Sequence, residues 1–204
     1  MSNRFLTPVI DTGHGGIING VYQTLGKRSP NWSKGVLYEG AANRWIAAKV
    51  MQKLDYEQLP YYHVSPELED TSLTIRSNRT NEIYSRNKNI YGISIHFNAG
   101  GGTGWEIFTT PGETMSDHIA DIFIQEFQKH HPLKARLGGT KDLEKDKEAN
   151  FSILRRTNCP FILLELGFMD NPTDYEKLWD EGFQDLMADM IVNSIKKVNE
   201  KYGK

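Results

Sequence analysis

The sequence lacks several features that would mark other classes of protein. It has one cysteine, Cys159, so no disulfide can form within the chain. That cysteine precedes Pro160 and an apolar run, which favours a buried structural thiol over a nucleophile. Positive charge is not in excess, because 24 Lys and Arg stand against 26 Asp and Glu, for a net charge of −2. Since no long basic run occurs either, we expect no nucleic-acid partner.

Long apolar runs are also missing. No stretch approaches the roughly 18 apolar residues of a membrane span, so we expect no membrane insertion. The first residues, Met1-Ser2-Asn3-Arg4, lead directly into a predicted strand and lack the apolar segment of a signal peptide. This predicts synthesis in the cytoplasm, unless a leader has been trimmed. No repeat, linker or composition break divides the chain, and its 204 residues suit a single domain spanning 1–204.

The first strong local signal is a short apolar strand that ends in a glycine-rich turn. Val9-Ile10 is β-branched, and the glycines of Gly13-His14-Gly15-Gly16 permit backbone conformations that a Cβ would forbid. The pattern places His14 at the carboxyl end of a strand, where open α/β sheets form their ligand crevices. Asp11 is a candidate partner that orients the His14 imidazole, and an ordinary turn-capping aspartate is the alternative.

A long loop and an amphipathic helix follow. The loop runs to Tyr38, and loops of such length are usually functional or disordered. Its aromatic residues Tyr22 and Trp32 either face a substrate or pack within a compact loop. From Glu39 to Leu54 the apolar spacing becomes helical. Glu39 then lies in the first helical turn, where the helix dipole favours a negative charge.

Strands and helices alternate along the rest of the chain. Apolar runs predict strands at 61–64, 90–96, 105–108 and 161–166, and helical spacing predicts helices at 73–87, 115–127 and 183–202. Asn171-Pro172 has the N-cap and first-turn residues of a further helix. This alternation predicts an α/β fold: a single domain with a twisted, mostly parallel β-sheet flanked by helices.

Candidate site residues gather at the ends of these predicted strands. His14, His96 and Glu165 each lie at or near a strand's carboxyl end, and such ends meet at one edge of a parallel sheet. Glu165 interrupts an apolar run, where a carboxylate is costly unless it is paired or bound to a metal. Glu39 could close the same ring. Two histidines and one carboxylate around an open position form a catalytic zinc arrangement, and a second carboxylate supplies the base that hydrolysis needs.

Four stretches then carry a family resemblance. They are Ile10-Asp11-Thr12-Gly13-His14-Gly15-Gly16, Glu39-Gly40-Ala41-Ala42-Asn43, Ser94-Ile95-His96-Phe97-Asn98-Ala99 and Leu164-Glu165-Leu166-Gly167-Phe168-Met169-Asp170-Asn171. With these in order, nearly the whole chain resembles the zinc-dependent N-acetylmuramoyl-L-alanine amidases of the amidase-3 type. Agreement is weaker at 73–76 and 151–155. Thr12 replaces a common proline, and a missing acidic turn leaves Arg76 without an assigned role.

The resemblance implies a site and a reaction. His14, Glu39 and His96 would be ligands of Zn²⁺, and Glu165 would be the catalytic carboxylate. The substrate would be peptidoglycan, cut at the amide bond between N-acetylmuramic acid and L-alanine. The alternatives are a zinc carboxypeptidase or endopeptidase acting on the stem peptides, and a non-catalytic wall-binding domain.

The resemblance also bears on where the protein works. With no signal peptide in this sequence, a phage-type lysis enzyme is expected, made in the cytoplasm and acting on the cell wall after release. A secreted housekeeping amidase with a trimmed leader is the alternative. We expect a monomer.

Overall fold

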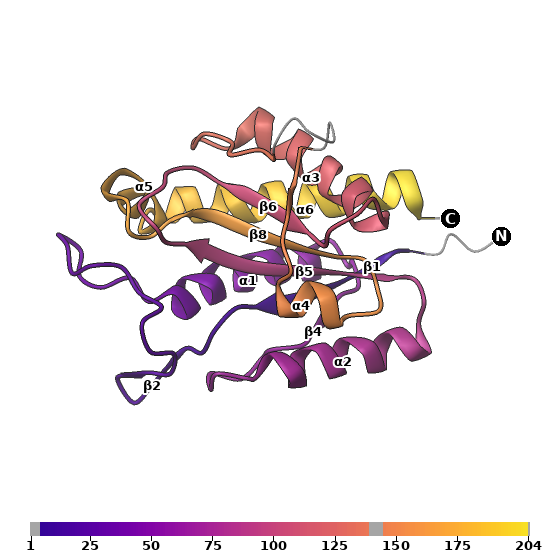
Figure 1. The fold of residues 1–204 in the computed structure, drawn as a ribbon, viewed down its shortest axis with the longest axis horizontal. Coiled ribbons are helices and arrows are strands. Elements are labelled where there is room, and N and C mark those ends of the chain that lie inside the picture. The colour runs from indigo at the N-terminus through magenta and orange to yellow at the C-terminus, as the bar shows by residue number, and fades with distance from the viewer. Residues whose placement is uncertain (1–4, 139–144, 204) are drawn as a thin grey trace.

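A central β-sheet organises the protein. The computed structural model describes residues 5–138 and 145–203. Within them the main sheet has the order β4-β1-β5-β8-β6-β7 (Figure 1). Its strands are β1 (Thr7–Thr12), β4 (Tyr62–His63), β5 (Ile90–Asn98), β6 (Glu106–Thr109), β7 (Lys147–Glu148) and β8 (Phe161–Phe168). Every neighbouring pair is parallel except β6 and β8, so the predicted single-domain, mostly parallel α/β fold is confirmed.

Helices cover both faces of the sheet. One layer holds α1 (Glu39–Tyr56), α3 (Met115–His130) and α6 (Glu181–Tyr202), which pack on one another. The other holds α2 (Leu73–Arg86) and the short α4 (Ser152–Arg156), and Figure 1 shows α2 and α4 away from α6. The remaining helix, α5 (Pro172–Leu178), follows β8. A small hairpin, β2 (Ile17–Ile18) with β3 (Val21–Tyr22), lies in the long loop after β1.

The alternation of side chains along β8 divides the core in two. Ile162 and Leu164 belong to the larger apolar cluster, which α1, α3 and α6 share. Phe161 and Leu163 belong to a smaller cluster on the α2–α4 face. Because successive side chains of a strand point to opposite faces, Glu165 points to the α2–α4 face. The sequence therefore sets the side of the sheet on which a site can form.

The boundaries differ from the sequence predictions where caps and edges decide them. The predicted strand at 61–64 is reduced to Tyr62–His63 at the sheet edge. The last helix begins at Glu181, because the Asp180 side chain accepts a hydrogen bond from the Phe183 N–H at 2.8 Å. Asn171 caps α5 as predicted, with bonds to the next turn at 3.0 and 3.2 Å.

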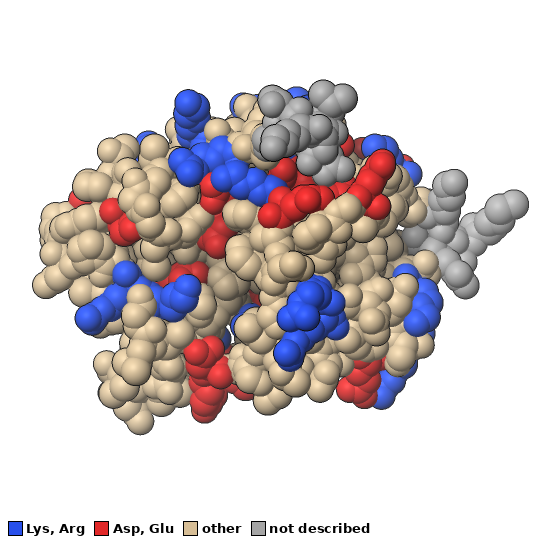
Figure 2. All heavy atoms as spheres, viewed as in Figure 1, with Lys and Arg blue, Asp and Glu red and all other residues tan. Residues whose placement is uncertain are grey.

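The surface and the helices add two general observations. Acidic and basic side chains are interspersed over the face drawn in Figure 2. Among the described helices, none combines the length and the apolar character that crossing a bilayer requires.

Candidate metal and catalytic site

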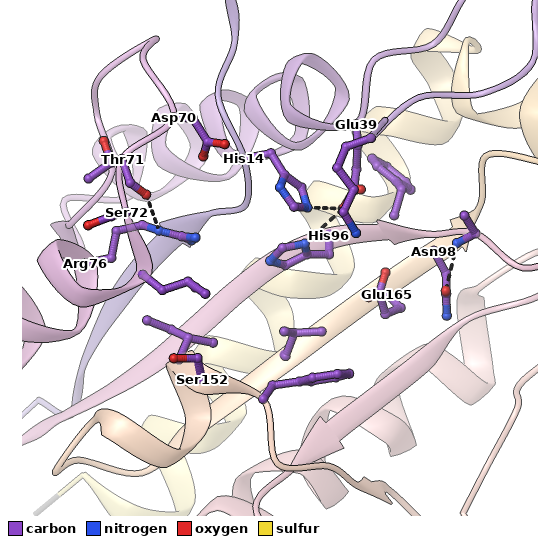
Figure 3. A pocket seen from close by; sticks show the side chains of 17 residues that line it. His14, Glu39, Asp70, Thr71, Ser72, Arg76, His96, Asn98, Ser152 and Glu165 are labelled. Carbon is purple, nitrogen blue, oxygen red and sulfur yellow. Dashed lines mark hydrogen bonds and ion pairs between the residues drawn. The ribbon is translucent and has the colours of Figure 1, made fainter. Parts of the chain in front are cut away.

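A pocket of about 620 Å³ lies where β1, β5 and β8 approach the long loop. All four predicted site residues line it: His14, Glu39, His96 and Glu165. Figure 3 shows these side chains directed toward one space, with those of α2 on its other side. The prediction that three strand ends and the start of α1 converge is therefore confirmed as geometry.

Three of these residues form a compact group of potential metal donors. His14 Nε2 lies 3.1 Å from Glu39 Oε1, and His96 Nδ1 lies 3.0 Å from the same oxygen. The three donor atoms all lie within 4.8 Å of one another. Donors around a tetrahedral zinc ion at bond lengths near 2.1 Å are separated by about 3.3 Å, so the group fits such an ion.

The turn that carries His14 is held from α1. His14 has a φ of 63°, a left-handed conformation uncommon for a residue with a side chain. The Asn43 amide donates to the Gly13 carbonyl at 2.9 Å, and Arg44 Nη1 donates to the His14 carbonyl at 2.7 Å. Sequence reasoning missed this role of Asn43 and Arg44. The signal available was their position one turn after Glu39, on the same helix.

The Glu39 carboxylate is almost fully buried, with 2% of the residue exposed. Burial alone would raise the pKa of the carboxyl. Hydrogen bonds from His14 and His96, with the charges of these imidazoles, outweigh burial and hold the pKa at about 2. Glu39 is therefore a permanent anion between two nitrogen donors, which is the form that coordinates a cation.

Glu165 has a different environment from that of Glu39. Its Cα pairs with that of His96 across β5 and β8, and its Oε2 is buried without a hydrogen-bond partner in the described part of the chain. Burial raises the pKa of the carboxyl well above its usual value. The negative charges of Glu39 and Glu106 add to this rise, while the positive charge of Lys27 opposes it. A carboxyl of this kind can hold or release a proton nearer neutral pH.

Asp11 does not serve as the partner of His14 that the sequence suggested. It is fully buried and accepts hydrogen bonds from Arg76 Nη1 at 2.9 and 2.8 Å and from the Ser94 hydroxyl at 2.6 Å. Arg76 also donates to the Thr71 carbonyl at 3.1 Å. This gives Arg76 the structural role that the sequence left open. The ion pair joins β1 to the start of α2 beneath the pocket.

The two loop aromatics contact protein and are absent from the pocket lining. The Tyr22 hydroxyl accepts from the Gly40 N–H at 3.0 Å, and its ring packs on Tyr38 at 4.5 Å. The Trp32 ring packs edge-on against Tyr175, with centroids 4.9 Å apart. Both residues therefore anchor the long loop, which agrees with the packing alternative of the sequence analysis.

Comparison with known proteins agrees with the four matching stretches. The sequence matches the Amidase_3 family, described as N-acetylmuramoyl-L-alanine amidase, over residues 9–197. A relative, the N-acetylmuramoyl-L-alanine amidase CwlM of Bacillus licheniformis, is 34% identical over 139 residues. The match covers 68% of this chain and 50% of that protein. The chain thus spans about half the length of this relative.

Solved structures agree on the fold. The crystal structure of an N-acetylmuramoyl-L-alanine amidase from Clostridium difficile 630 superposes with a TM-score of 0.80 at 27% identity. The match covers 99% of this chain and 100% of that one. The catalytic domain of CwlV from Bacillus (Paenibacillus) polymyxa var. colistinus gives 0.75 at 24% identity, over 95% and 98% of the two chains. At that identity the likeness concerns the fold alone.

Gly13→Ala should disrupt metal binding without removing a ligand. A Cβ at Gly13 would lie 2.1 Å from His96 Cε1, so the imidazole must move. We expect zinc affinity, measured by competition with a chelator, to fall at least about tenfold, the lower bound for disturbing groups that orient metal ligands. Gly182→Ala, on α6 away from the pocket, is the control and should keep full affinity. Unchanged zinc affinity in Gly13→Ala would contradict this view of the turn.

Arg76→Met should destabilise the fold, because it leaves Asp11 buried without a charged partner. Breaking a buried pair costs about 3–5 kcal/mol in the free energy of unfolding, which urea denaturation measures. Arg79→Met is the matched control on the same helix, since its partner Glu67 and its own side chain are 35% and 38% exposed. Exposed pairs contribute about 0–1 kcal/mol. Equal losses in the two variants would show that the Asp11–Arg76 pair has no special weight.

Proposed function

The chain belongs to the N-acetylmuramoyl-L-alanine amidase family, and on that premise we propose that it is a zinc-dependent amidase of peptidoglycan. It would hydrolyse the amide bond between N-acetylmuramic acid and L-alanine. The observation that carries the proposal is the convergence of two imidazoles, one buried carboxylate and a second carboxylate on one pocket. Peptidoglycan is accordingly the proposed partner, and the wall is the proposed place of action.

His14, Glu39 and His96 are the proposed zinc ligands. Their donor set, two nitrogens and one oxygen with a fourth side open to the pocket, is one that catalytic zinc sites use. A bound zinc ion supplies a Lewis acid that makes water a stronger nucleophile and polarises the substrate carbonyl. The single negative charge of Glu39 leaves the loaded site with a net positive charge, which attracts the carbonyl oxygen.

Glu165 is the proposed general base and then general acid. It takes a proton from the attacking water on Oε1 or Oε2 and returns it to the departing amino group of L-alanine. The support for this role is its place across from His96, its unpartnered Oε2 and its raised pKa. The pocket walls of α2 and α4 would exclude bulk water and hold the muramyl peptide.

Two other functions remain distinguishable from the proposal. A zinc peptidase acting on the stem peptides could use the same donor set, but it would release different ends. A non-catalytic wall-binding domain would have no need for all four site residues, and all four line the pocket here. The experiment that separates them is digestion of purified sacculi with and without a chelator. New free L-alanine amino termini that appear only with zinc support the amidase.

The two glutamates should respond differently to loss of charge. Glu39→Gln removes a ligand, so zinc content and activity should both fall. Glu165→Gln removes the base but no ligand, so zinc content and the melting temperature should hold while turnover falls about 100- to 10,000-fold. Metal analysis and turnover on both variants, side by side, test this. If Glu165→Gln loses zinc while Glu39→Gln keeps it, the two roles are reversed.

A further inference from the structure

Lys27 is a basic side chain of the pocket that the reaction described above does not use. It lines the pocket with His14, Glu39 and Glu165, and it is exposed to solvent. No ion pair or side-chain hydrogen bond from its ammonium group occurs among the described residues. Its charge nevertheless acts on the Glu165 carboxyl, which places the ammonium group within electrostatic reach of the reacting centre.

The backbone of Lys27 is fixed beside a proposed metal ligand. Its carbonyl accepts a hydrogen bond from the Glu39 N–H at 2.9 Å. The next residue, Arg28, forms an antiparallel bridge with Tyr38, and the Ser29 N–H donates to the Leu37 carbonyl at 2.8 Å. Although the side chain is free, its starting point is therefore held in register with α1.

The other charges of the pocket make Lys27 distinctive. The second basic lining residue, Arg76, is paired with the buried Asp11 and carries no free charge into the pocket. The acidic lining residues are Glu39, Asp70 and Glu165. Away from the metal, an anionic group of a substrate would meet repulsion from these carboxylates at every place except beside Lys27.

On the basis of the proposed function, we propose that Lys27 determines specificity by binding a carboxylate on the peptide part of the substrate. A lysine suits this role because its ammonium group can follow a carboxylate as a flexible point charge. Stem peptides offer two such groups: the α-carboxylate of an internal γ-linked glutamate, which can be free or amidated, and the carboxylate at the C-terminus. The shared chemistry is a peptide carboxylate held near the metal.

Three muramyl tripeptides test the proposal and distinguish the two sources. The first has both carboxylates free, the second has the internal α-carboxylate amidated, and the third has the C-terminus amidated. For the wild-type enzyme, amidation of the group that Lys27 binds should raise KM about tenfold, the size of one charge-assisted hydrogen bond. The amidated position that raises KM identifies the source.

Lys27→Met should remove this discrimination. We expect it to raise KM about tenfold for the free acid, to leave KM for the sensitive amide unchanged, and to keep kcat within about twofold, because only a binding contact is lost. Lys27→Arg should restore the preference. Lys34→Met is the matched control, since Lys34 lies on the same loop, pairs with Glu176 at 2.9 Å and is not among the pocket-lining residues.

Two outcomes would overturn the proposal. One is an equal KM for all three peptides in the wild-type enzyme. The other is a Lys27→Met variant that lowers kcat equally on all three peptides, because Lys27 would then act on Glu165 rather than on the substrate. If the wild-type enzyme cleaves none of the peptides, the proposed amidase function fails instead. Equilibrium binding of the same peptides to wild type and Lys27→Met then decides whether a carboxylate is bound.

Discussion

The buried carboxylate of Glu39 is the constraint on which the rest of the site depends. An ionised carboxylate out of water is unfavourable unless cations or donors surround it. Here the compensation comes from His14 and His96, which reach the same Oε1 from different strands. Their approach requires the missing Cβ of Gly13 and the left-handed backbone at His14. The glycine-rich turn and the helix start thus depend on each other, although 25 positions separate His14 from Glu39 in the sequence.

Much of this arrangement follows from local patterns that a sequence displays. Continuous apolar runs indicated buried parallel strands, and the polar residues at their carboxyl ends had to meet at one edge. His96 and Glu165 do so as Cα partners of adjacent strands. Asn171-Pro172 predicted a helix start because capping is a local interaction. The fold class and the four site residues were therefore accessible without coordinates.

The parts that escaped prediction depend on partners far apart in the chain. Asp11 precedes His14 closely, which suggested a contact, yet its bonds go to Arg76, 65 positions away, and to Ser94. Which of two polar neighbours a buried carboxylate contacts depends on the direction of its side chain from the strand, and that emerges only in three dimensions. Tyr22 illustrates the same limit, since long loops can either face a substrate or pack on themselves.

The fold also separates two carboxylates that the sheet places side by side. Glu106 and Glu165 are Cα partners of the antiparallel strands β6 and β8, so both point to the same face. Glu106 pairs with Arg136 at 2.8 Å and with Lys147, and it accepts from the Asn98 amide at 2.5 Å. Glu165 has no such partners in the described residues. Because compensated charge stabilises one carboxylate as an anion and burial favours the proton on the other, the environments assign a structural role to Glu106 and leave Glu165 free for proton transfer.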